Sequence, residues 1–96
     1  MPNYLQELQL KPNDVQAHNN LGIAFAQLGH NAEAADQFAA AAQLDPDNTE
    51  IRINLGTTLA GLGRMAEART QFEAVIKLKP GDTEAREALA HLPSNP

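Results

Sequence analysis

The sequence predicts an all-α fold, a right-handed solenoid in which antiparallel helix pairs are stacked one after another. The first observation is a repeat: residues 13–46 align without a gap on residues 47–80, with 14 identities in 34 positions. The second is that apolar residues recur at helical spacing within each copy. The third is that Gly and Pro helix-stop signals fall at equivalent places in both copies. Self-similarity with a fixed period of roughly 20–50 residues is typical of stacked-repeat proteins.

The first complete helix is expected over residues 13–28. Asn13 suits the N-cap, and Gln16, three residues later, can reach back to form a capping box. Leu21 belongs to the apolar stripe of this helix. Gly29 is expected to end it, because glycine accepts the left-handed conformation that follows many helices. The equivalent capping positions in the next two units are Asp47 and Gly81.

The second helix is expected over residues 32–44, where Pro46 stops it because proline cannot continue a helix. The second copy repeats this plan, with helices expected over residues 48–62 and 65–78. A third copy of the first helix is expected over residues 83–92. The pattern therefore predicts alternating antiparallel helices joined by short loops.

We interpret the chain as one domain that contains two full repeats, with half-repeat helices on either side. Its expected parts are a partial helix of a preceding repeat (1–12), the two repeats (13–46 and 47–80), a C-terminal capping helix (81–93) and a frayed tail (94–96).

Composition excludes several classes of function. Seven Lys and Arg residues stand against twelve Asp and Glu, so the formal charge is −5, and no basic cluster that would bind nucleic acid is present. No apolar run is long enough to span a membrane. The absence of Cys excludes disulfides and thiolate catalysis, and it fits a reducing, cytoplasmic location.

Catalytic and metal-binding patterns are missing from the sequence. The three histidines, His18, His30 and His91, are far apart and have no ligand-like spacing. Glu33 and Glu67 open the second helices, where a carboxylate stabilises the positive end of the helix dipole. We therefore expect no enzyme activity, no metal and no cofactor.

The recurring residues resemble the tetratricopeptide repeat (TPR) family. The family pattern of Leu-Gly in the first helix, a large apolar residue after it, Ala and an aromatic in the second helix, and Pro at the boundary has two matches here. These are Leu21-Gly22, Phe25, Ala34, Phe38 and Pro46, then Leu55-Gly56, Leu59, Ala68, Phe72 and Pro80. The sequence departs from the family where an aromatic residue often precedes the Leu, at His18, Arg52 and Arg86.

The resemblance implies a scaffold that binds an extended protein or peptide segment in a concave groove lined by the first helices. Asn20 and Asn54 precede the repeated Leu and resemble the asparagine ladder of O-linked N-acetylglucosamine transferases. Solvent exposure without a ligand is the alternative interpretation of these two residues. The groove residues that the resemblance implies are Asn19, Asn20, Ile23, Gln27, Glu50, Ile53, Asn54, Thr57, Glu84 and Glu87.

The groove positions predict the charge of the partner. Chaperone-binding members of the family hold a C-terminal carboxylate with Lys, Arg and Asn, whereas Glu84 and Ala88 stand where basic residues would be needed. Neutral or basic peptides are therefore expected over acidic ones. Nucleic acid and membrane partners are not expected.

Two further roles stay open at the level of sequence. One is self-association, in which copies stack head to tail through apolar residues at the two ends. The other is the substrate-recognition arm of a larger enzyme. The end residues concerned are Tyr4, Leu5, Leu8, Ala85, Leu89 and Leu92.

Overall fold

The computed structural model describes residues 14–92, and this part of the chain contains helices and connecting turns without a strand. The predicted helix over 1–12 and the tail over 94–96 lie outside the described residues. The helices are α2 (Val15–Gln27), α3 (Asn31–Leu44), α4 (Thr49–Gly61), α5 (Met65–Leu78) and α6 (Thr83–His91). The all-α prediction is confirmed.

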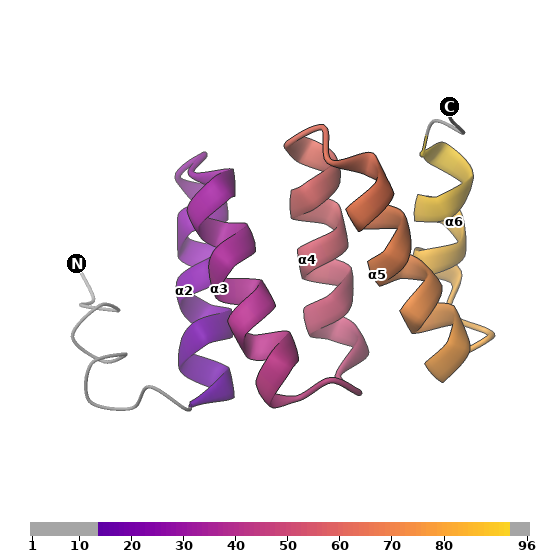
Figure 1. Cartoon of the computed structure of the whole chain (residues 1–96), viewed down its shortest axis with the longest axis horizontal. Helices are drawn as coiled ribbons and strands as arrows, with labels where there is room; N and C mark the ends of the chain where they lie inside the picture. Colours follow the sequence, from indigo (N-terminus) through magenta and orange to yellow (C-terminus); the bar gives the residue numbers. More distant parts are fainter. Residues whose placement is uncertain (1–13, 93–96) are drawn as a thin grey trace.

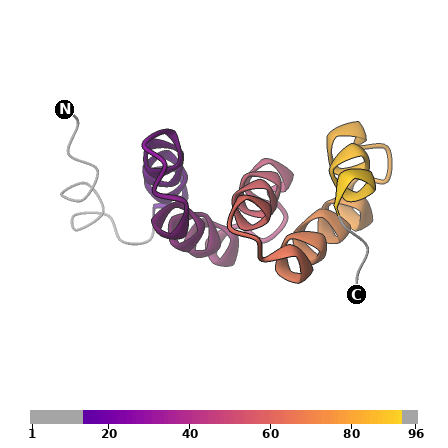
Figure 2. The same cartoon turned by 90° about the horizontal axis from the view of Figure 1, so that it is seen from above.

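The helices alternate in direction along the molecule, and each packs against the next one in the chain (Figure 1). Figure 2 shows two layers, with α2, α4 and α6 on one side and α3 and α5 on the other. This arrangement is the solenoid that the repeat predicts, because equivalent helices fall in the same layer. None of the described helices has the length and apolar character needed to cross a membrane.

The N-caps of α2, α4 and α6 each lie one residue later than predicted. These caps are Asp14, Asn48 and Asp82, and each side chain accepts a hydrogen bond from the backbone N–H three residues on, at 3.1, 3.2 and 2.9 Å. The expected caps Asp47 and Gly81 precede these positions, and Asn13 lies outside the described residues. Gly81 has no side-chain oxygen that could accept such a hydrogen bond, whereas Asp82 next to it does.

The ends of the first helices follow the prediction. Gly29 and Gly63 have φ angles of 83° and 81°, in the left-handed region that glycine adopts without strain. Each glycine therefore turns the chain sharply from a first helix into its partner.

A small residue and a large ring meet where the two helices of each pair cross. A Cβ atom added to Gly22 would lie 2.7 Å from the Phe38 ring, and one added to Gly56 would lie 2.8 Å from the Phe72 ring. Both rings are buried. Glycine is therefore required at these positions for close approach, which explains why it interrupts two helices in spite of its low helix propensity.

The polar residues that replace the family's aromatic join each helix to its neighbours. His18 Nδ1 lies 2.9 Å from Gln37 Oε1, and the equivalent Arg52 donates from Nη1 to Gln71 Oε1 at 2.8 Å. Arg52 also donates from Nε to the carbonyl oxygen of Pro46 at 2.7 Å. Arg86 and Pro80 repeat that last contact at 2.7 Å. Hydrogen bonds to loop carbonyls thus help to hold the joints between successive pairs.

Candidate functional site

A hollow of about 390 Å³ lies on the side of the molecule formed by α2, α4 and α6. We call it the groove. Its walls come from three neighbouring first helices and from the edge of one phenylalanine ring on α3. The lining residues are Ile23, Ala26, Gln27, Phe38, Ile53, Asn54, Thr57, Thr58 and Glu84.

Six residues that the resemblance implied line this hollow together: Ile23, Gln27, Ile53, Asn54, Thr57 and Glu84. Asn20, Glu50 and Glu87 lie on the same helices but outside its lining. Asn19 is only 6% exposed. Sequence reasoning missed Ala26, Phe38 and Thr58, since Phe38 and Thr58 are buried and Ala26 packs against the core.

The position of Asn54 in the groove is set by a neighbouring helix. Asn54 donates from Nδ2 to Oδ1 of the buried Asn19 at 3.3 Å, which links α4 to α2. The bond uses one of the two N–H groups of Asn54 and leaves its Oδ1 and its other N–H for a ligand. Asn19 therefore supports the groove from beneath instead of forming its surface.

Asn20 has different surroundings from its repeat equivalent Asn54. Its Oδ1 accepts a hydrogen bond at 3.1 Å from Gln16 Nε2, one turn earlier on α2. Asn20 is half-buried, so its side chain remains partly accessible. The two asparagines therefore present their amides differently. Asn54, on α4, bonds across to α2, whereas Asn20 bonds to a residue of its own helix.

The charged groups around the groove are acidic. Glu84 lines it, and Glu50 and Glu87 are exposed on the same helices. Among the described residues that line the groove, none is Lys or Arg. Arg52 and Arg86 belong to α4 and α6, but both donate to carbonyl oxygens of the loops. The groove therefore presents negative charge to a partner.

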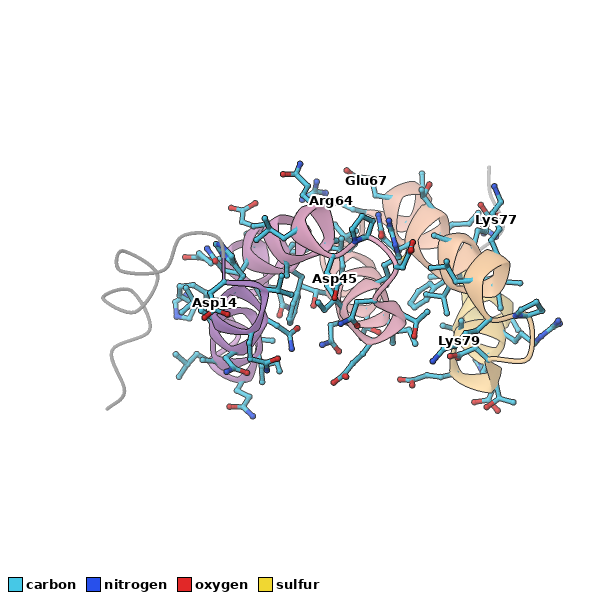
Figure 3. All side chains as sticks on the ribbon, turned by 90° about the horizontal axis from the view of Figure 1, so that it is seen from below. Asp14, Asp45, Arg64, Glu67, Lys77 and Lys79 are labelled. Carbon is cyan, nitrogen blue, oxygen red and sulfur yellow. The ribbon has the colours of Figure 1, made fainter. Side chains whose placement is uncertain are left out.

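A second hollow of about 350 Å³ lies between α3 and α5, with Leu55 and Leu59 of α4 among its lining. Arg64 and Glu67 stand beside it, and Figure 3 shows their side chains close together at the α3 and α5 side of the molecule. Arg64 Nη2 donates to Glu67 Oε1 at 3.0 Å. This hydrogen bond, opposed in part by desolvation, lowers the pKa of the Glu67 carboxyl.

The histidines are separated in space as they are in sequence. His18 lies beside Gln37, His30 Nδ1 lies 3.7 Å from Glu33 Oε2, and His91 Nδ1 donates to the carbonyl oxygen of Glu87 at 2.7 Å. Within residues 14–92, no group of three or more His, Cys, Asp or Glu residues is arranged to hold a metal ion.

The predicted head-to-tail contact involves Tyr4, Leu5 and Leu8, which lie outside the described residues. On the other side of that contact, Leu89 and Leu92 are half-buried against the core, and Ala85 is a buried residue of α6. Self-association therefore stays a prediction, as does attachment to a larger enzyme.

Several solved structures share this fold. The second TPR domain of the human RPAP3 protein, in complex with the HSP70 peptide SGPTIEEVD, is 25% identical, with a TM-score of 0.84 over 91% of this chain and 72% of that one. The first TPR of Spaghetti (RPAP3), bound to the HSP90 peptide SRMEEVD, also has a TM-score of 0.84 at 24% identity, over 91% of this chain and 69% of that one.

A structure of MamA AMB-1 is 28% identical, with a TM-score of 0.84 over 91% of this chain, which spans 48% of the MamA chain. No curated protein sequence matched the chain. A family model described as "Tetratricopeptide repeat" matches residues 25–92, which is most of the chain. Together with the paired helices and the repeated Gly–Phe crossings, this match shows that the chain belongs to the tetratricopeptide repeat family.

Proposed function

We propose that this chain is a protein-interaction module that binds an extended segment of a partner protein in the groove, without chemistry of its own. The observation that carries the proposal is the hollow across α2, α4 and α6, which is lined both by apolar side chains and by the side-chain amides of Gln27 and Asn54. Concave sites of a few hundred Å³ with a few convergent polar groups are typical of ligand binding.

The amide of Asn54 supports an extended peptide as the ligand. Its free Oδ1 and remaining N–H match the N–H and C=O groups that an extended backbone leaves unpaired. The human RPAP3 domain, which is similar in fold, was solved with a peptide in complex. Peptide binding is therefore the function class that the site chemistry and the fold both favour.

The charge of the groove favours a neutral or basic segment. The peptide in the human RPAP3 structure ends in Glu-Glu-Val-Asp. In this chain Glu84 lines the groove, and Glu50 and Glu87 are exposed on the helices that form it, so an acidic segment would face like charges. Like-charge contacts at an interface disfavour binding, whereas complementary charges also speed association.

The test is selection from a library of random twelve-residue peptides, followed by measurement of the selected peptides by fluorescence anisotropy. We expect Asn54→Ala to weaken binding by about 1 kcal/mol, or about fivefold, because a hydrogen bond is lost with little change in burial. Asn20→Ala is also expected to weaken binding of the peptide. Gln43→Ala, an exposed amide on α3, is the matched control.

Circular dichroism melting of each variant separates lost binding from lost folding. Selected peptides that bind Asn54→Ala and the control with equal affinity would refute a role for the groove. Enrichment of Asp- and Glu-rich peptides would refute the charge preference.

A further inference from the structure

We infer that the groove selects peptides in which an aliphatic side chain and a lysine or arginine side chain are separated by one residue. The inference rests on the proposed function and specifies the ligand of that same site. The aliphatic side chain lies against Ile23 and Ile53, and the basic side chain lies beside Glu84.

The apolar part of the groove lies between α2 and α4. Ile23 is 36% exposed, which makes it one of the few large aliphatic residues with its surface open to water. Beside it, Ile53, Ala26 and the Phe38 ring line the same hollow. An aliphatic side chain that covers Ile23 removes apolar surface of both partners from water, and this burial favours binding.

The acidic part of the groove lies on α6. Glu84 is exposed and forms no ion pair among the described residues. The nearest cation in the sequence, Arg86, donates from Nε to the Pro80 carbonyl. Glu87, on the same helix, adds a second negative charge. A ligand cation here therefore gains a partner without displacing one that the protein already provides.

The geometry of an extended chain sets the spacing. Alternate side chains of such a chain point the same way and are about 6.6–6.8 Å apart, while the side chain between them points away. Ile53 of α4 and Glu84 of α6 line the same hollow, and both helices pack against α5. A chain that crosses α4 can therefore place one side chain against Ile53 and the second-next one toward α6, where the long stem of Lys or Arg covers the remaining distance to Glu84.

The test uses nine-residue, end-blocked peptides with one leucine and one lysine in a Ser/Gly background. In the matched peptide one residue separates leucine from lysine; in the mismatched peptide of equal composition they are adjacent; in a third, glutamate replaces the lysine. Both chain directions are included, because alternate side chains share a side in either direction. Anisotropy competition against a library-selected peptide reports affinity.

We expect the matched peptide to bind about fivefold more tightly than the mismatched one, and the glutamate peptide to bind most weakly. Glu84→Lys is expected to invert the preference between lysine and glutamate peptides. Glu73→Lys, the same charge change at an exposed position of α5, is expected to preserve it. A fourth peptide carries alanine in place of the leucine of the matched peptide, and Ile23→Ala is expected to abolish the difference in affinity between these two peptides.

Equal affinities of the matched and mismatched peptides, or a Glu84→Lys variant that keeps the original preference, would overturn this selectivity. In that case library peptides that still depend on Asn54 would leave the proposed function intact. If no peptide of either kind depends on the groove residues, the proposed function and this inference both fail.

Discussion

The two full repeats have closely similar sequence signals and different surroundings. Helix α2 has four buried residues and its equivalent α4 has seven, although Leu21-Gly22 in the first and Leu55-Gly56 in the second occupy the same places. The reason is position: α4 packs against both α3 and α5, whereas the main partner of α2 within the described residues is α3. Burial in a solenoid therefore depends on the neighbours of a unit as well as on its own sequence.

The largest expected effect is at the helix crossings. Gly56→Ala places a methyl group against the Phe72 ring and should lower the free energy of unfolding by about 1–3 kcal/mol, measured by urea denaturation. Gly22→Ala should cost less, because α2 can shift away from α3 more freely than α4 can move between two helices. A larger loss of unfolding free energy in Gly22→Ala than in Gly56→Ala would contradict the claim that the second repeat is more tightly held.

Gly61→Ala is the matched control for both substitutions. Gly61 is the last residue of α4, and an added Cβ would have its nearest neighbour, Asn31 Nδ2, at an ordinary distance of 3.6 Å. We expect no loss, and a gain of up to about 1 kcal/mol from helix propensity.

The second prediction concerns the joints between helices. Arg52→Ala removes hydrogen bonds to Pro46 and Gln71 and should cost about 1–2 kcal/mol in thermal or urea unfolding. His18→Ala should cost less, because the imidazole, whose Nδ1 lies 2.9 Å from Gln37 Oε1, is smaller than the guanidinium and its long stem. Arg52→Lys keeps the charge but lacks the planar fork, so we expect it to restore only part of the loss. If Arg52→Lys is as stable as the parent, the charge and the packing of the side-chain stem are enough to stabilise this joint.

The smallest effect concerns the first turns of α3 and α5. Arg64 hydrogen-bonds to Glu67 and lowers the pKa of that carboxyl, while the equivalent His30 lies 3.7 Å from Glu33. A carboxyl whose pKa is lower in the folded state stabilises the protein above its unfolded pKa, and this stability disappears as pH falls through the folded pKa.

Glu67→Gln should therefore lower the urea midpoint at pH 7 slightly, and its difference from the parent should vanish as the pH falls below the range in which glutamate titrates, near 4. Glu33→Gln should shift the midpoint less at pH 7. Because the Arg64 and Glu67 side chains are both exposed to solvent, added salt should weaken the effect of the pair. Equal shifts in the two variants would show that it does not matter whether Arg64 or His30 lies beside the carboxylate.

The 34-residue period was enough to predict the fold because each signal in it is local. Gly29 and Gly63 end helices through their own backbone conformation, and proline stops a helix without help from the rest of the chain. The cap positions were predicted one residue too early, since Asn13 and Asp14, like Asp47 and Asn48, are adjacent residues that both suit a cap.

The groove was less predictable than the fold. The exposed positions on one face of each first helix follow from helical periodicity and the family resemblance, which identified Ile23, Asn54 and Glu84. The bond from Asn54 to Asn19 depends on how α4 is placed against α2, and no local pattern encodes that placement. The burial of Asn19 was not predicted either, and it means that Asn19 holds Asn54 in place instead of contacting a ligand itself.

The hydrogen bond between Asn19 and Asn54 spans 35 positions, the largest separation of any side-chain hydrogen bond described for residues 14–92. The contacts that stabilise the structure are therefore made between nearby stretches of chain, and closing them costs little loop entropy. Low contact order of this kind is associated with fast folding. In a stack of repeats folding can start in one unit and spread outward, and α4, which packs against both α3 and α5, is the helix that joins the two units of this chain.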